Sequence, residues 1–300
     1  MSKTLGKKAG YSKRDLKAYY YIAPWLIGFA ILQLYPFISS LIYSFADYSI
    51  GSKPDFMGFG NYIKLFTKDK EFWTSLRVTI VFALMTVPGK IILALAVAIF
   101  LNRDIRGINL IRTLYYIPSL FGGSVAIAIL WKLMFLDNGP INAVLTALRL
   151  PNVQFLGSTT WALPTICLLE IWQFGSSMVM FLAALKNVPK SLYEAAEIDG
   201  AGKTKRFWHI TLPQISPIIF FTVLNQTIQA LQNFTSADVI TEGGPLKSTY
   251  VLGMKLYREG FGYFKMGYAS AISWIVFTVI LTFTVVLFAS SKLWVHYADE

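Results

Sequence analysis

The sequence is poor in the side chains from which catalytic and metal centres are built. Its 300 residues include one cysteine and two histidines. The single Cys167 excludes an intrachain disulfide, and it lies in an apolar run, whereas His209 and His296 lie in polar segments. These three side chains supply neither a cysteine–histidine nucleophile pair nor the ligands of a zinc site. The sequence therefore predicts no metal site, no catalytic residue and no enzymatic activity of its own.

Charged residues are also scarce, at 14% of the chain against about 25% in an ordinary soluble domain. They cluster and leave long apolar runs between them, and a helix that crosses a membrane needs about 20 such residues. Six runs are long enough: about 20–45, 75–101, 111–135, 160–185, 214–236 and 268–291. The first exceeds the apolar core of a signal peptide, so we expect it to be retained. The predicted fold is an all-α polytopic membrane protein with six transmembrane helices.

The distribution of Lys and Arg predicts which loops face the cytoplasm. One side has 15 Lys and Arg in 62 residues, in segments 1–18, 102–112, 186–209 and 292–300. The other side has 9 in 84 residues, in loops 46–74, 136–158 and 236–267. We therefore expect a multi-pass protein of the cell membrane with both termini in the cytoplasm. The same pattern accounts for the net charge of +11, so we predict no nucleic-acid partner.

A charged island, EAAEIDGAGKTKRFWHITLPQISP, separates the fourth and fifth apolar runs at residues 194–217. A short helix can begin at Glu194 and end in a tight turn at Gly200, and a second short helix should be limited by Pro213. The island resembles the EAA loop of permease subunits in binding-protein-dependent ABC importers, especially those of the carbohydrate branch. The matching positions are Glu194, Ala195, Ala196, Asp199, Gly200, Ala201, Phe207, Ile210, Leu212, Pro213 and Pro217.

A second resemblance to the carbohydrate permeases follows the fifth apolar run. The stretch ITEGGPLKST at residues 240–249 has two glycines and a proline, which should form a defined turn on the outer side. The residues that match the family are Thr241, Gly243, Gly244, Pro245 and Thr249. A docked binding protein could contact this turn, although the same residues could simply end the helix.

The resemblance is to the maltose and glycerol-3-phosphate permease family, and it implies a type I ABC importer transmembrane domain. It divides the chain into a cytoplasmic tail 1–18, an extra first transmembrane helix 19–45, a permease core 71–291 with the coupling loop 186–213, and a tail 292–300. It also implies a heterodimer with a second, related permease, two cytoplasmic ATPase subunits and an extracytoplasmic solute-binding protein. The chain itself should carry no cofactor, because the ATPase subunits would bind ATP and Mg.

The stretch GAGKT at residues 200–204 looks like the end of a phosphate-binding P-loop. That motif requires a glycine five residues before Gly202, where the sequence has Glu197, and no strand precedes it. Without the backbone amides of a strand–loop–helix unit a triphosphate is not cradled. We therefore expect ATP hydrolysis in separate subunits.

Uncharged amides in the fifth apolar run suggest a path for a polar, neutral cargo such as a sugar. Asn225, Gln229, Gln232 and Asn233 are spaced at i, i+4, i+7 and i+8, which predicts one helical face. Hydrogen bonding between helices is the alternative role for such residues.

The fourth run adds Glu170 and Trp172, a carboxylate and an aromatic ring that could also contact cargo. Lys90 in the second run is an ionisable group at membrane depth, and it could pair with Glu170. A glycerol phosphate or polyol importer remains an alternative to a sugar importer. An ion-coupled secondary transporter is a different class, which would predict inverted repeats and titratable relays that the sequence does not display.

Overall fold

The computed structural model describes residues 13–103 and 106–296, and the regular elements of this part of the chain are helices apart from one short strand pair. Up to residue 103 the elements are α1 (Lys13–Phe29), the π-helix η1 (Ala30–Leu34), α2 (Tyr35–Ser44), β1 (Ala46–Asp47), β2 (Asp55–Phe56), α3 (Gly60–Thr67) and α4 (Lys70–Leu101). From residue 106 to the 186–213 loop they are α5 (Ile108–Leu120), α6 (Val125–Met134), α7 (Pro140–Ala147), α8 (Ala162–Trp172) and α9 (Gly175–Asn187).

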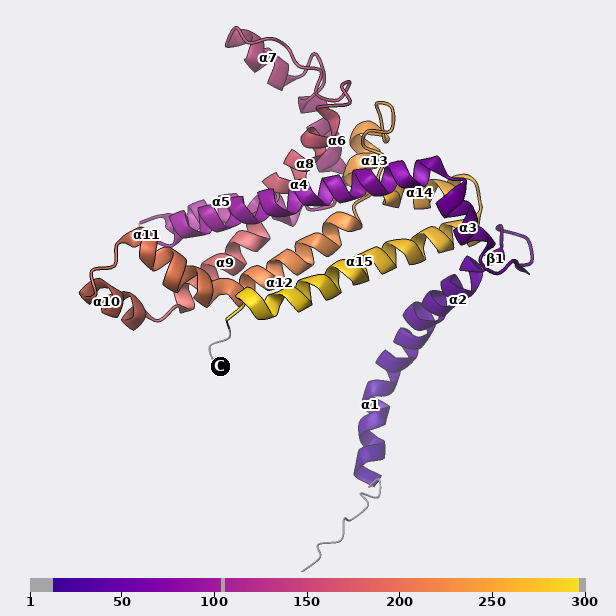
Figure 1. The fold of residues 1–300 in the computed structure, drawn as a ribbon, viewed down its shortest axis with the longest axis horizontal. Helices are drawn as coiled ribbons and strands as arrows, with labels where there is room; N and C mark the ends of the chain where they lie inside the picture. Colours follow the sequence, from indigo (N-terminus) through magenta and orange to yellow (C-terminus); the bar gives the residue numbers. More distant parts are fainter. Residues whose placement is uncertain (1–12, 104–105, 297–300) are drawn as a thin grey trace, which may run out of the picture.

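The 186–213 loop and the C-terminal third of the chain form the remaining elements. They are α10 (Lys190–Ile198), α11 (Lys203–Arg206), η2 (Phe207–Thr211), α12 (Leu212–Leu231), α13 (Thr235–Thr241), α14 (Leu252–Tyr257), η3 (Arg258–Gly262) and α15 (Met266–Trp294). Figure 1 shows α4, α12 and α15 lying side by side, with α10 and α11 at one end of the bundle and α3 and α14 at the other. The two loops singled out in the sequence therefore lie at opposite ends of the long helices.

Four helices are long and apolar enough to cross a membrane: Tyr20–Ser44, Lys70–Leu101, Lys203–Leu231 and Met266–Trp294. Two more spans are formed if each of two bent helix pairs counts as one. The prediction of six spans is thus confirmed, with four continuous and two broken.

The third predicted span, 111–135, is broken between α5 and α6, whose axes differ by 101°. The break coincides with two glycines, and Gly123 has a φ of +72°, which ends helical geometry there. The fourth, 160–185, is bent by 45° between α8 and α9. Here Gly175 lets the chain pass close to α5, because a Cβ at this position would lie 2.6 Å from the carbonyl oxygen of Tyr115.

The fifth span differs from the prediction at both ends. The helix runs unbroken from Lys203, so the expectation that Pro213 would limit a separate short helix is wrong. The π-helix η2 leads directly into α12 just before Pro213, and its wider turn accommodates the proline without ending the helix. At the other end the helix stops at Leu231, and Gln232 is its C-cap.

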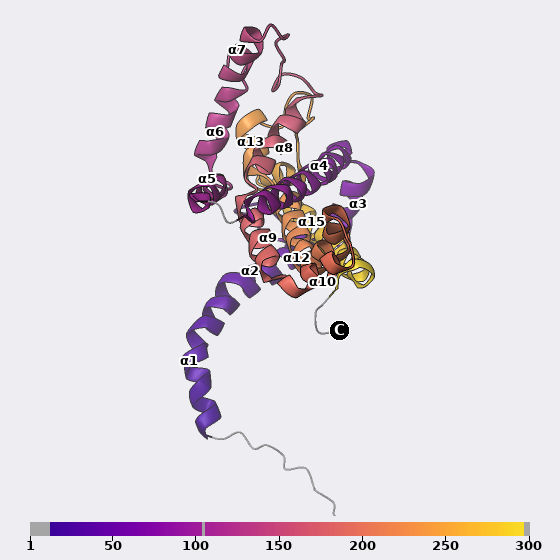
Figure 2. The same cartoon turned by 90° about the vertical axis from the view of Figure 1, so that its left-hand side faces the viewer.

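The N-terminal helix stands apart from the bundle for most of its length, as Figures 1 and 2 both show. Its α2 part packs on α15, where the rings of Phe37 and Trp274 are 4.8 Å apart. None of the most apolar stretch of the helix Tyr20–Ser44 is buried (0%).

A compact corner joins this helix to the bundle. β1 pairs antiparallel with β2, and Asn61 donates hydrogen bonds to the carbonyl oxygens of Ser44 and Ala46 at 3.0 and 2.9 Å. Tyr62 donates to the hydroxyl of Ser44 at 2.8 Å. These bonds fix α3 against the end of α2.

Candidate functional site

A small cavity with both polar and apolar walls lies between α4, α8 and α12. Its volume is about 20 Å³, which is room for a water molecule but not for a sugar ring. Its lining includes one cation, one carboxylate and two amides, from Lys90, Glu170, Gln226 and Gln229. An intramembrane site with both charges and neutral hydrogen-bonding groups is suited to hold a polar molecule in passage.

Lys90 reaches this cavity from the middle of α4 and is 7% exposed. Among the described residues it has no ion pair within 4.0 Å and no hydrogen bond. Glu170 lines the same cavity, so the two charges of opposite sign lie on its walls without direct contact.

Glu170 is held in place by the break after α12. Its Oε1 accepts a hydrogen bond of 3.0 Å from Nδ2 of Asn233, whose Oδ1 in turn accepts one of 2.9 Å from Ser236. Asn233 can bend back to Glu170 because it has left the helix. The prediction that Asn225, Gln229, Gln232 and Asn233 share one helical face is therefore wrong for Asn233.

The other predicted cargo residues separate into two groups. Gln229 lines the cavity but is also exposed, as is Gln232, and Asn225 donates to Phe221 within its own helix at 2.9 Å. Gln226, which the sequence pattern did not favour, is 8% exposed and donates to Ser177 at 3.2 Å.

Trp172 lies in a different, mostly apolar cavity of about 630 Å³ between α5, α6 and the break after α8. Tyr115, Phe121 and Phe174 line the same cavity. The ring of Trp172 is 5.8 Å from that of Trp131 on α6. The structure thus separates Trp172 from Glu170, although only one residue stands between them in the sequence.

The turn after α10 has the geometry of a Schellman C-cap. Ala201 N–H donates to the carbonyl of Ala196 at 2.8 Å, and Gly200 N–H donates to that of Glu197 at 3.1 Å. Gly200 has a φ of +75°, a conformation that strongly favours glycine.

Two side-chain contacts tie the helices of the 186–213 loop together. Arg206 pairs with Glu197 at 3.1 Å, and the hydroxyls of Tyr193 and Thr211 are 2.9 Å apart. Of the motif residues, Glu194, Ala195, Asp199 and Gly200 are exposed, while Ala196, Ala201, Phe207, Leu212 and Pro213 are partly buried. The loop also exposes Ile198 (87%) and Trp208 (58%), two large apolar side chains suited to contact a partner.

The 241–245 turn is firmly anchored at the other end of the bundle. The hydroxyl groups of Thr241 and Thr249 are 2.6 Å apart, and that of Thr249 donates to the carbonyl of Gly244 at 2.9 Å. Gly243 is buried with a φ of +86°, and a Cβ there would lie 2.9 Å from the ring of Tyr250. After Pro245, Leu246 is 91% exposed at the tip.

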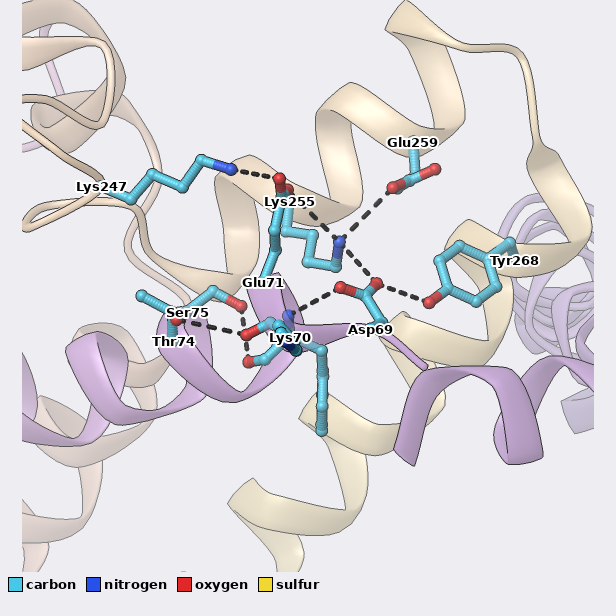
Figure 3. Close-up of polar contacts among 10 residues, drawn as sticks. Asp69, Lys70, Glu71, Thr74, Ser75, Lys247, Lys255, Glu259 and Tyr268 are labelled. Atoms are coloured by element: carbon cyan, nitrogen blue, oxygen red, sulfur yellow. Dashed lines mark hydrogen bonds and ion pairs between the residues drawn. The ribbon is translucent and has the colours of Figure 1, made fainter. Parts of the chain in front are cut away.

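The sequence did not indicate an ionic cluster at this same end, which is shown in Figure 3. Lys255 of α14 has a side chain only 2% exposed and pairs with Asp69 at 2.7 Å, Glu259 at 3.4 Å and Glu71 at 3.9 Å. Asp69 also accepts a hydrogen bond of 2.6 Å from the hydroxyl of Tyr268. One carboxylate therefore connects α4, α14 and α15.

Asp69 has a second role as the N-cap of α4, where it accepts a hydrogen bond of 3.0 Å from Phe72 N–H. Burial raises its pKa, but the hydrogen bonds from Lys255, Tyr268 and Phe72 together hold the pKa below the ordinary aspartate value. A lowered pKa in the folded state stabilises the fold above the unfolded pKa, and this contribution is lost as the pH falls through the folded value. The Asp69 carboxylate therefore keeps its charge at neutral and mildly acidic pH.

Replacing Lys255 with methionine should strongly destabilise this end of the bundle. The substitution leaves the carboxylates of Asp69 and Glu259, each 13% exposed, without their cation. Removing one partner of a buried pair costs about 3–5 kcal/mol. We expect the melting temperature of the purified complex to fall by roughly 10 °C.

Lys247→Met is the matched control, because Lys247 pairs with Glu71 while its side chain is 46% exposed. Exposed pairs contribute about 0–1 kcal/mol, so its melting temperature should stay within about 3 °C of the wild type. Equal melting temperatures for the two variants would contradict a structural role for Lys255.

Known proteins resemble this chain over most of its length. The family described as "Binding-protein-dependent transport system inner membrane component" matches residues 68–296. The probable ABC transporter permease protein YesP of Bacillus subtilis is 43% identical over 297 residues, covering 98% of this chain and 96% of that protein. The lactose transport system permease protein LacF of Rhizobium radiobacter is 33% identical over 94% of this chain and 98% of its own length.

The solved structures include a similar fold. A chain from the crystal structure of a bacterial ABC transporter involved in the import of the acidic polysaccharide alginate superposes with a TM-score of 0.79. It is 25% identical, and the match covers 93% of this chain and 96% of that one.

Proposed function

Because the chain belongs to the family of inner-membrane components of binding-protein-dependent transport systems, we propose that it is the permease subunit of an ATP-driven sugar importer. The observation that carries the proposal is the 186–213 loop. A turn that requires positive φ at Gly200 fixes two short helical segments that expose Ile198 and Trp208, and the second continues directly into a membrane-spanning helix. Such a loop is suited to dock on a soluble ATPase and to move the span with it.

The proposed assembly contains a second, related permease, two cytoplasmic ATPase subunits and an extracytoplasmic binding protein. The ATPase subunits would bind ATP and Mg and contact the exposed motif residues, Glu194 and Gly200 among them. The second permease would cover part of the apolar surface of α5 and α6, where Leu114 is 57% exposed and Leu133 is 51% exposed. The binding protein would contact the 241–245 turn at the opposite end.

This assembly sets the proposed orientation in the cell membrane. The 186–213 loop and both termini lie in the cytoplasm, with the 241–245 turn and the Lys255 cluster outside. The basic residues of the loops support the same orientation, with 15 in 62 residues on the cytoplasmic side.

The proposed cargo is a sugar or oligosaccharide, as with the relative named for lactose and the structure named for alginate. In the central cavity, Gln226, Gln229 and the Glu170–Asn233 pair offer donors and acceptors for hydroxyl groups. A phosphate group is best bound by several cations, and Lys90 is the one Lys or Arg among the residues that line this central cavity. The residues therefore favour the neutral hydroxylated cargo over the phosphate.

Reconstitution of the complete importer in liposomes tests this function. The solute is a radiolabelled oligosaccharide that the binding protein binds in calorimetry. It should accumulate in the liposomes only when both ATP and the binding protein are present. Uptake driven by an ion gradient without nucleotide would instead indicate a secondary transporter. Inhibition of uptake by glycerol 3-phosphate, but not by unlabelled oligosaccharide, would contradict the sugar assignment.

A further inference from the structure

A second large cavity lies next to the Lys255 cluster, and neither the transport path nor the 186–213 loop uses it. It has a volume of about 470 Å³ and lies between α3, the start of α4, η3 and the start of α15. Besides the cluster, its wall is formed by four lysines and two tyrosines: Lys64, Lys68, Lys70, Lys265, Tyr263 and Tyr268.

The carboxylates in this wall are already paired. Asp69 and Glu259 accept from Lys255, and Glu71 pairs with Lys247, as Figure 3 shows. These three acids and two lysines leave a local charge of −1, against which the four wall lysines place +4. The cavity therefore carries an excess of positive charge.

The four wall lysines have no carboxylate within 4.0 Å among residues 13–103 and 106–296. Two of them lie over aromatic rings, Lys64 at 4.9 Å from the ring centre of Tyr268 and Lys265 at 5.4 Å from that of Tyr263. Cation–π contact directs these two ammonium groups without neutralising them. They remain available for an anion.

Next to the cavity, the outer side of α3 exposes large apolar side chains. Phe59 is 66% exposed, Ile63 is 59% exposed and Phe66 is 43% exposed, while Trp73, in the first turns of α4, is 51% exposed. A short helix with lysines on one side and large apolar residues on the other lies in the plane of a membrane interface. Tryptophan at the end of a span is typical of the same depth. The lysines are therefore placed at the level of lipid headgroups.

We propose that this cavity binds the phosphate of an anionic phospholipid, such as phosphatidylglycerol, from the leaflet at this end of the bundle. Lysine ammonium groups bind phosphate as point charges, and the apolar side of α3 contacts the acyl chains. A zwitterionic lipid carries its own cation and gains less from the excess positive charge. The bound lipid would hold α3, α4 and α15 together beside the Lys255 cluster, independently of which solute the protein moves.

Native mass spectrometry of the purified complex with added lipid tests the site. Wild type should retain phosphatidylglycerol at least tenfold more tightly than phosphatidylcholine. The double variant Lys64→Gln/Lys68→Gln should bind phosphatidylglycerol roughly 20-fold more weakly, at about fivefold per lysine, with phosphatidylcholine unchanged. The control Lys53→Gln/Arg149→Gln removes two exposed cations that do not line the cavity and should change retention less than twofold.

Four results would overturn the proposal. Equal retention of the two lipids would exclude selection by charge, and equal losses in both double variants would show a diffuse effect of net charge. Full displacement by millimolar inorganic phosphate would indicate a soluble anion instead of a lipid. Unchanged lipid retention in Lys64→Gln/Lys68→Gln, together with lost docking of the binding protein, would assign this surface to an acidic protein partner. Size-exclusion chromatography of each variant would verify that the complex is intact.

Discussion

Replacing Gly200 with valine should reduce ATP-driven uptake by about tenfold while the complex still assembles. The residue has a φ of +75°, and a β-branched side chain in that region costs about 1–2 kcal/mol, or a five- to 30-fold smaller population of the native turn. The loss is conformational and not steric, because a Cβ at Gly200 would have no atom within 4 Å apart from its chain neighbours. Uptake and ATPase activity stimulated by the binding protein should fall together.

Gly202→Val provides the matched control two residues away. Gly202 has a φ of −66° and a ψ of 165°, which valine adopts easily, and a Cβ there would also meet open space. This variant should retain at least half of the wild-type uptake. If both valine variants were equally impaired, the loop would be sensitive to added bulk, and the positive φ at Gly200 would not explain the result.

Replacing Lys90 with methionine should prevent stable assembly or reduce uptake more than 100-fold. The substitution leaves the carboxylate of Glu170 on the wall of an apolar bundle with no cation in the same cavity. Glu170 is partly buried, and leaving a buried charge uncompensated costs up to about 3–5 kcal/mol, equivalent to two orders of magnitude or more in the folded population. The measurement is the yield of monodisperse complex, followed by uptake in liposomes.

Adding Glu170→Gln to Lys90→Met should restore assembly, since the cavity then contains no charge. Asn233 can still donate to the new amide, so the packing at the break after α12 is retained. The exposed pair Lys132–Glu242, 3.7 Å apart, is the control, and its Lys132→Met variant should assemble normally. A double variant that assembles no better than Lys90→Met would show that the two charges do not compensate each other.

Uptake by the double variant separates the two roles of the polar residues. If Glu170 contacts cargo, the restored complex should still transport poorly, and Gln229→Ala should weaken uptake further, since each hydrogen bond contributes about 0.5–1.5 kcal/mol. Full uptake by the double variant and by Gln229→Ala would assign these groups to bundle packing.

Local sequence signals predicted the features that are themselves local. The turn at Gly200 follows from a glycine after a helical segment, and the apolar runs follow from composition. The break between α5 and α6 also has a local signal, the pair Gly122–Gly123, but an average of hydropathy over a window is insensitive to a bend.

Other features depend on contacts between distant segments and have no local signal. The chain has neither glycine nor proline where α12 ends at Leu231. The helix ends where Gly253 packs closely against the chain, since a Cβ at Gly253 would lie 2.8 Å from the carbonyl oxygen of Asn233. Asp69 and Lys255 meet only because α4 and α14 pack together. The periodicity of a helix could not place Asn233 against Glu170, because the contact requires the helix to have ended.

The continuous helix Lys203–Leu231 joins the loop to the cavity. From Arg206 to Gln226 it spans about 30 Å, so a change in tilt of about 5° displaces its far end by about 2.6 Å. Arg206 is fixed to α10 through Glu197, and Gln226 forms part of the cavity wall. If the central cavity is the solute path proposed above, the angle at which the loop is held sets the size of a space that, in this conformation, has room for only one water molecule.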